Sequence, residues 1–550
     1  MYGLMQDRPL SLPHVFHRAE RLFGHKSMVT ASPAGETRVT YREWAGRVRR
    51  LATVLDSLGV SAEARVGSFA WNTQRHLELY FAVPCTGRVL HTVNIRLFAD
   101  QIRYIVEHAA DEVMFVDRSL LPILWPLADE LTGVRHWVVM DDGADAEIPD
   151  DERVHDYEEL LAAAEPFAGR FEVADENTAA ALCYTSGTTG NPKGVLYSHR
   201  STVLHSLISL TADTAGLGER DTLLPVVPMF HVNAWGLPSA AVMAGADLVF
   251  PGPALQPAAL LGLVQRHRVT ITAGVPTIWM GAVPLLRDFD LSSLRMVIGG
   301  GSAVPRALSE AWRERIGLPI TQAWGMTETS PIASFGTLRS QHDGLDTAAL
   351  ADVRASQGQV VPLVDLRIVD PETGQEQPWD GRSAGELQAA GPWIAASYYG
   401  NESGAGSFTE DGWLRTGDVA TLDEHGYLRL VDRTKDLVKS GGEWISSVEL
   451  ENEIMAHPGV AEAAVIAKPD ERWSERPVAC VVLAEGVRLE AGDIIEHLRP
   501  RVAKWWLPDE VFFLDEVPKT STGKFSKKTL RERFYPEGMP RSLEEPAPGA

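Results

Sequence analysis

The stretch YTSGTTGNPKG, residues 184–194, decides how the rest of the chain is interpreted. It follows an apolar run of strand length at residues 179–183 and combines hydroxyl side chains, glycines and one lysine, Lys193. Glycines let backbone N–H groups approach phosphate oxygens, hydroxyls add donors, and a lysine adds positive charge. A strand that opens into such a loop is therefore typical of a polyphosphate site, although many loops of this composition are plain surface turns. The loop is not a Walker A motif, because Lys193 lies between Pro192 and Gly194, where that motif needs Gly-Lys-Ser/Thr.

The composition is that of an ordinary globular protein with more than one domain. The 550 residues are 45% apolar and 23% charged, and the chain is too long for one compact core. The formal net charge is −23, from 51 Lys and Arg against 74 Asp and Glu, which argues against a general nucleic-acid binder. Three dispersed cysteines, Cys85, Cys183 and Cys480, indicate buried thiols rather than a disulfide framework or a zinc site.

Nothing in the sequence indicates export or a membrane span. The N-terminus has no basic region followed by an apolar run, and no apolar stretch approaches the ~20 residues that cross a bilayer. We therefore expect a cytoplasmic protein without a transmembrane segment.

Alternating strand and helix patterns predict an α/β fold with largely parallel sheets. TYRE at residues 40–43 is a capping box, and apolar residues follow it at helical spacing up to Gly59. Strand-like runs lie at residues 64–70, 113–116 and 137–140, with helical segments between them. Near the C-terminus the pattern becomes small α+β, with a capping pattern at Ser446 and Glu449 and strands at residues 463–467 and 478–483. We expect a large N-terminal domain of several subdomains over residues 1–433 and a small C-terminal domain over residues 434–550.

Four further motifs put glycines, aromatic rings and carboxylates where an ATP site needs them. GGGSA (299–303) follows a predicted strand, at the end where α/β sheets bind ligands. QAWGMTET (322–329) offers a ring for adenine, a hydroxyl for phosphate and a carboxylate for Mg2+. WLRTGD (413–418) and DRTKD (432–436) add carboxylates and cations. Taken singly, each has a plain alternative as a turn, a packed corner or a solvated charged link.

The motifs occur in the order that is found in the adenylate-forming enzymes, a superfamily of acyl-CoA synthetases, adenylation domains and luciferases. The resemblance covers about residues 10–535, and residues 90–117 resemble the medium- and long-chain fatty acyl-CoA synthetases. It implies that ATP and AMP bind at Thr185, Ser186, Gly187, Thr188, Thr189, Gly190, Lys193, Gly301, Ser302, Ala303, Gln322, Ala323, Trp324, Gly325, Met326, Thr327, Asp418, Arg433 and Lys435. Trp324 stands where the family usually has Tyr, so stacking should survive but a phenol hydroxyl contact should not.

The same resemblance assigns the acid and CoA sites. Trp235 matches the residue that gates the acyl tunnel in the long-chain enzymes. A Phe-His pair beside a tryptophan is also common in packed core corners. The acyl pocket would comprise His231, Val232, Trp235, Gly274, Val275, Pro276 and Gly300. The path of the CoA thiol would comprise Lys439, Ser440, Gly441, Gly442, Glu443 and Trp444.

The implied reaction has two half-reactions in one site. A carboxylate attacks the α-phosphorus of MgATP, and CoA then displaces AMP from the acyl-adenylate. Thr185 and Glu328 would hold Mg2+, Lys193 would hold the departing phosphates, and Lys524 would be the catalytic lysine. Lys435 would be the hinge about which a mobile C-terminal domain swings, whereas Lys527, Lys528, Arg531 and Arg533 are predicted to form a solvated helix face.

The resemblance leaves the acid open. A medium- or long-chain fatty acid is the favoured substrate; the alternatives are a short-chain, sulfonium-bearing or aryl acid. A luciferase-like adenylating oxidoreductase is also an alternative, because the motifs are shared. The partners implied are ATP, the acid and CoA, and a homodimer is an expectation from the branch that the chain resembles.

Overall fold

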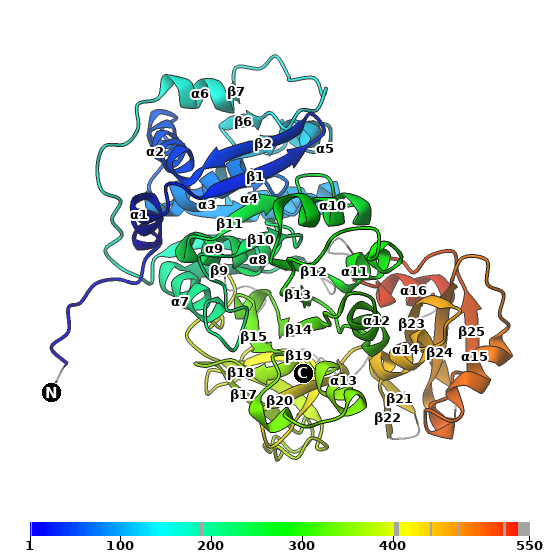
Figure 1. The fold of residues 1–550 in the computed structure, drawn as a ribbon. Helices are drawn as coiled ribbons and strands as arrows, with labels where there is room; N and C mark the ends of the chain where they lie inside the picture. The colour runs from blue at the N-terminus through cyan, green and yellow to red at the C-terminus, as the bar shows by residue number, and fades with distance from the viewer. Residues whose placement is uncertain are drawn as a thin grey trace, which may run out of the picture.

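The computed structural model of the chain describes residues 1, 3–185, 191–400, 406–440, 443–470, 472–520 and 524–536. Its elements alternate between strand and helix as the α/β prediction requires, with two sheets in a large N-terminal part and a third sheet in a smaller C-terminal part (Figure 1). Residues 186–190, 441, 442 and the C-terminal tail of the sequence lie outside the described residues.

A seven-stranded sheet carries the phosphate-loop motif. Its order is β7-β6-β5-β3-β4-β8-β9, and every pair is parallel except β8–β9. All the strands predicted in this region are present, and β8 ends where the loop begins. The bounds are β3 (Arg65–Phe69), β4 (Val89–Thr92), β5 (Asp111–Asp117), β6 (His136–Met140), β7 (Val154–Asp156), β8 (Ala179–Tyr184) and β9 (Gly194–Ser198).

A thirteen-stranded sheet carries the other ATP motifs. From β1 through β11, β10, β12, β13 to β14 neighbouring strands are parallel, and from β14 through β15, β16, β20, β19, β18 to β17 they are antiparallel. The bounds are β1 (Ser27–Ser32), β2 (Gly35–Thr40), β10 (Thr222–Pro225), β11 (Asp247–Phe250), β12 (Ile271–Gly274), β13 (Met296–Gly299), β14 (Ile320–Gly325), β15 (Ile332–Phe335), β16 (Gly358–Val360), β17 (Asp365–Val369), β18 (Gly385–Ala390), β19 (Leu414–Leu422) and β20 (Tyr427–Arg433).

The C-terminal sheet has five strands and is mostly antiparallel, as the α+β pattern predicts. Its strands are β21 (Val438–Ser440), β22 (Glu443–Ile445), β23 (Val460–Asp470), β24 (Ser474–Leu483) and β25 (Glu510–Phe513). Because β20 ends at Arg433 and β21 begins at Val438, the linker between the sheets is short. The division after residue 433 stays a prediction.

Helices cover the sheets, and their ends follow the sequence signals. Thr40 and Glu43 form the predicted capping box, and Ser446 accepts a hydrogen bond from the Glu449 N–H. None of the helices in the described ranges combines the length and apolar character needed to cross a bilayer. The longer helices are α1 (Leu12–Leu22), α2 (Tyr41–Ser57), α3 (Gln74–Cys85), α4 (Ala99–Ala109), α7 (His199–Ser209), α9 (Leu237–Ala244), α10 (Pro257–His267), α12 (Arg306–Ile316), α13 (Thr347–Arg354), α14 (Ser447–Met455), α15 (Ala491–Leu498) and α16 (Lys527–Phe534). The short ones are α5 (Leu121–Leu124), α6 (Tyr157–Ala163) and α11 (Pro276–Ala282), and the segment labelled α8 (Val232–Trp235) is a single left-handed turn.

Candidate active site

The two ends of the phosphate loop are tied together. The Thr185 N–H donates to the Lys193 carbonyl at 2.9 Å, and the Lys193 N–H donates to Thr185 Oγ1 at 3.1 Å. Just outside this neck, Tyr184 pairs with Gly194 between β8 and β9. Thr185 and Lys193 are thereby held at the two ends of the loop, whose residues 186–190 lie outside the described residues.

Tyr398 links this neck to the predicted metal ligand, and the sequence analysis missed it. Its hydroxyl donates to Glu328 Oε1 at 2.6 Å, and its ring centroid lies 4.8 Å from Lys193 Nζ. The next residue is tied in too, because the Tyr399 N–H donates to the Gly194 carbonyl at 2.8 Å. The Tyr-Tyr-Gly run at residues 398–400 was the available signal. Tyr398 thus contacts both the carboxylate of Glu328 and the ammonium of Lys193.

Glu328 is suited to a cation that arrives with the substrate. It is 4% exposed, and burial raises its pKa, while the hydrogen bond from Tyr398 and the charges of Arg433 and Lys193 oppose that shift. Within the described residues, no cluster of three or more His, Cys, Asp or Glu side chains forms a metal cage. Mg2+ is often held by one or two carboxylates together with substrate phosphates, so a single buried carboxylate fits Mg2+ bound to ATP.

The predicted acyl gate lies against the glycine loop that follows β13. A Cβ built on Gly300 would lie 3.0 Å from Trp235 Cη2 and 3.0 Å from the Ala323 carbonyl oxygen. A Cβ on Gly301 would lie 3.5 Å from Val275 Cγ1 and 3.5 Å from Lys524 Cε. A side chain at position 300 would crowd Trp235 and Ala323, and Trp235, Val275, Ala323 and Lys524, from four separate motifs, all meet this glycine loop.

Lys524 enters this point from the C-terminal part of the chain. Burial and the positive charges of Arg433 and Lys435 lower its pKa to about 8, against the opposing effect of Asp418 and Glu328. Burial, together with Lys524, also lowers the pKa of His231, to about 3, so that imidazole is neutral beside the ammonium. An incoming phosphate or carboxylate would therefore meet the Lys524 ammonium, which can lose its proton near neutral pH, and not a charged His231.

This pKa predicts how adenylation depends on pH. Lys524 is charged below about pH 8 and loses its proton as the pH rises through that value, and only the charged form neutralises phosphate oxygens. Since kcat/KM reports groups of the free enzyme, kcat/KM for ATP should fall about tenfold per pH unit above that point. Lys524→Arg keeps its charge and should lose this descending limb. A limb that persists in Lys524→Arg would assign the titration to another group.

The segment that carries Trp235 is a left-handed turn. The backbone φ is 47° at Val232, 49° at Asn233 and Ala234, and 58° at Trp235. Left-handed conformation costs about 1–2 kcal/mol per non-glycine residue, and such strain persists where surrounding contacts enforce it, commonly at functional sites. Here Asn233 Oδ1 accepts from Cys183 Sγ at 3.2 Å and from Thr92 Oγ1 at 3.3 Å. The strained turn is thus anchored on β4 and β8, beside the phosphate loop.

Gly236 ends this turn, and its replacement should be costly. Its φ is 68°, and an added Cβ would lie 2.5 Å from Nδ1 of His205, a ring that is 2% exposed. Overpacking costs about 1–3 kcal/mol and the left-handed backbone about 1–2 kcal/mol, so Gly236→Ala should lower the free energy of unfolding by about 2–5 kcal/mol. Gly59→Ala is the matched control, because Gly59 has φ 65° and open space around it. Equal losses in urea unfolding would refute the steric account.

Asp418, one of the predicted nucleotide-binding residues, lies between two donors. The Trp324 indole N–H donates to Asp418 Oδ2 at 2.9 Å, and Arg433 Nε lies 3.3 Å from Asp418 Oδ1. Trp324 therefore makes a polar contact that the sequence analysis did not foresee when it expected only stacking. Lys435, the predicted hinge, follows in the linker, and burial and Arg433 lower its pKa.

Of the predicted CoA residues, Gly441 and Gly442 lie outside the described residues. Lys439 and Trp444 pair between β21 and β22, with Lys439 Nζ 5.2 Å from the Trp444 ring centroid. α16, which follows Lys524, contacts the linker just before this hairpin, because Arg531 pairs with Asp436. The structure brings Lys524, the predicted catalytic lysine, to the glycine loop, and the thiol path stays a prediction.

The prediction that four cations of α16 form a solvated face was wrong for two of them, whereas Lys528 and Arg533 are exposed. Lys527 and Arg531 do not lie on a solvated helix face. Lys527 Nζ pairs with Glu451 at 2.7 Å with both side chains 11% exposed, and Arg531 pairs with Asp436 in the linker. Periodicity alone did not reveal that α16 packs against β23.

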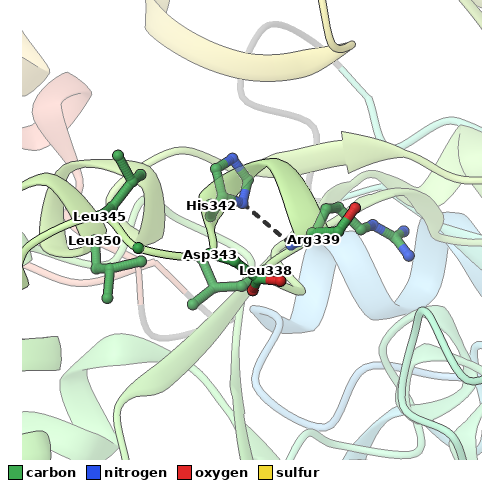
Figure 2. A pocket seen from close by; sticks show the side chains of 8 residues that line it. Leu338, Arg339, His342, Asp343, Leu345 and Leu350 are labelled. Atoms are coloured by element: carbon green, nitrogen blue, oxygen red, sulfur yellow. Dashed lines mark hydrogen bonds between the residues drawn. The ribbon is translucent and has the colours of Figure 1, made fainter.

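A surface pocket of about 440 Å³ is separate from this site. It is lined by residues between Leu338 and Leu350, including Arg339 and His342, and Figure 2 shows them gathered around one loop. None of the predicted site residues is among those that line it. Its Arg339 pairs with Asp213, so its one arginine already has a structural partner.

Comparison with known proteins decides the family. The family model described as AMP-binding enzyme matches residues 16–399, and the model of the AMP-binding enzyme C-terminal domain matches residues 449–524. The chain belongs to the AMP-binding enzymes. These are the adenylate-forming enzymes that the motif order indicated, and the match includes both the N-terminal ATP motifs and Lys524.

Relatives of this AMP-binding enzyme include named CoA ligases. It is 47% identical over 536 residues to a long-chain-fatty-acid–CoA ligase of Thermus thermophilus, covering 96% of each chain. It is 44% identical over 543 residues to a 3-methylmercaptopropionyl-CoA ligase of Ruegeria pomeroyi, covering 97% of this chain and 99% of the relative. A crystal structure of an anthranilate CoA ligase in complex with anthranoyl-AMP superposes with a TM-score of 0.86 at 27% identity, covering 96% of this chain and 99% of that one.

Proposed function

We propose that this AMP-binding enzyme joins a medium- or long-chain fatty acid to coenzyme A through an acyl-adenylate, with release of pyrophosphate and AMP. The observation that carries the proposal is the approach of Lys524 to the glycine loop, where a Cβ on Gly301 would lie 3.5 Å from Lys524 Cε and 3.8 Å from Trp235 Cζ2. This arrangement suits a fatty acid, because the lysine can contact the carboxylate and the tryptophan ring can contact the apolar chain.

In the first half-reaction, a carboxylate oxygen attacks the α-phosphorus of ATP and the bond to pyrophosphate breaks. Charge builds up on phosphorus and on the leaving group, so the protein's contribution is positioning and electrostatic stabilisation. Lys524 would contact the carboxylate and the α-phosphate, and Lys193 would contact the leaving phosphates. Thr185 and Glu328 would hold Mg2+, which supplies further neutralisation of the phosphate charge.

In the second half-reaction, the CoA thiolate attacks the acyl carbonyl carbon and the bond to AMP breaks. The thiol needs a path to that carbon, whereas Lys524 has completed its role. One site with two different sets of needs calls for a rotation of the C-terminal domain between the two steps. Lys435 in the short linker is the proposed hinge.

The proposal leaves the identity of the carboxylic acid substrate open, and two relatives are named for different acids. The Thermus relative is named for long-chain fatty acids, and the Ruegeria relative, at nearly the same identity, for a short sulfur-containing acid. Buried Trp235, which is 8% exposed and packs on Gly300, favours a tunnel that opens for an apolar chain.

Pyrophosphate release tests the proposal. Purified protein is incubated with MgATP, with or without CoA, and with straight-chain acids from acetate to stearate and 3-methylmercaptopropionate. We expect release to peak with a fatty acid of medium or long chain and to turn over only when CoA is present. A peak with 3-methylmercaptopropionate would transfer the proposal to a short sulfur-containing acid, and light emission with luciferin in place of an acyl-CoA product would overturn it.

A further inference from the structure

Trp324 makes a hydrogen bond that stacking on adenine does not require. Its indole N–H donates to Asp418 Oδ2 at 2.9 Å, and both residues are 6% exposed. The other buried indoles with hydrogen bonds of this kind, those of Trp279, Trp312 and Trp393, donate to backbone carbonyls. Trp324 thus directs its donor to a charged acceptor.

The contact is not a consequence of neighbouring strands. Trp324 lies on β14 and Asp418 on β19, and β15, β16 and β20 lie between them in the sheet. At about 4.8 Å per strand, a flat sheet would separate these two strands by about 19 Å. The antiparallel end of the sheet must therefore curve back so that the two side chains meet.

The hydrogen bond from Trp324 orients the Asp418 carboxylate and leaves further lone pairs available as acceptors. An ionised carboxylate has about four lone-pair sites and accepts only. The indole N–H occupies one site on Oδ2, and Arg433 Nε lies 3.3 Å from Oδ1. The remaining lone pairs are held in a set orientation and are suited to two hydroxyl donors on adjacent carbons.

We propose that Trp324 is a positioning residue for the nucleotide sugar. It acts through Asp418, and it thereby sets the preference of the site for ribonucleotides over deoxyribonucleotides. This inference rests on the proposed function and takes from the resemblance to the adenylate-forming enzymes that Asp418 binds the ribose hydroxyls. Trp324 supplies both a ring face for the base and the N–H that orients the group recognising the sugar.

Binding of AMP, 2′-deoxyAMP and 3′-deoxyAMP to the full chain, measured by calorimetry, tests the inference. Trp324→Phe keeps an aromatic ring and removes the N–H. Because hydrogen bonds to charged groups are strong, the Kd for AMP should rise about tenfold more than the Kd for at least one of the deoxynucleotides. A smaller ring weakens stacking equally for all three ligands, so the ratio of Kd values isolates the sugar contact.

Two further variants make the test specific. Trp312→Phe also removes a buried indole N–H, one that donates to the Trp279 carbonyl at 3.2 Å, and should leave the Kd ratio unchanged. In an Asp418→Ala background, where the indole N–H has lost its acceptor, Trp324→Phe should change the ratio by less than about twofold, because contacting residues couple in a double-mutant cycle.

The opposite outcomes are distinguishable. An equal loss for all three nucleotides in Trp324→Phe, or an undiminished effect in the Asp418→Ala background, would overturn the inference while leaving the ligase proposal in place. Failure of the wild-type chain to bind AMP would overturn both.

Discussion

Replacing Lys524 with alanine is expected to lower the rate of acyl-adenylate formation by at least about a hundredfold. A charged donor aimed at a developing anion in a water-excluded site commonly contributes this much. The partly buried ammonium, beside Gly301, is the group placed to meet the α-phosphate. Thiolation of a chemically supplied acyl-adenylate should stay within about threefold of wild type, because that step does not use the ammonium.

Lys519→Ala is the matched control for this prediction. Lys519 lies on the same terminal loop, is 35% exposed and pairs with Glu462 at 2.9 Å. Its removal should leave both half-reactions nearly unchanged. If Lys524→Ala slowed both half-reactions equally in protein that unfolds like wild type, the assignment of Lys524 to the first step would be wrong.

Glu328→Gln should lower adenylation by about a hundredfold and raise the Mg2+ concentration at half-maximal activity. The substitution keeps the size of the side chain and its hydrogen bond from Tyr398, and it removes the negative charge available to the cation. Because burial raises the pKa of Glu328, the ionised form is held at a cost in the folded state. Glu328→Gln should therefore leave the free energy of unfolding unchanged or slightly increased.

Glu310→Gln is the comparison for a carboxylate away from the site. Glu310 is partly buried and pairs with Arg313 at 2.6 Å. It should not alter the Mg2+ requirement. A Glu328→Gln enzyme with wild-type Mg2+ dependence would show that another group holds the cation.

The fold could be predicted because its signals are local. The apolar runs became β3, β5, β6 and β8, and the capping box at Thr40 begins α2. The glycine loop after β13 could be placed because ligand loops follow the carboxyl ends of strands. The family itself was recognisable from the order of its motifs, because that order can be read from the sequence without knowing how the side chains pack.

The contacts within the site could not be predicted, because they join residues that are distant in sequence. Tyr398 meets Glu328 across 70 positions, and Trp324 meets Asp418 across 94. The left-handed turn at Val232–Trp235 opposes local preference and is held by Asn233 against other strands. Lys527 was misassigned for the same reason, since its burial against Glu451 depends on tertiary packing.

Transfer of isotopic oxygen tests the acyl-adenylate most directly. A fatty acid labelled with 18O in both carboxylate oxygens is converted with MgATP and CoA, and the products are analysed by mass spectrometry. Attack of the carboxylate on the α-phosphorus, followed by thiolation, leaves one labelled oxygen on AMP and none on pyrophosphate. Label in phosphate or pyrophosphate, or acyl-CoA formed alongside unlabelled AMP, would contradict the adenylate mechanism on which this account rests.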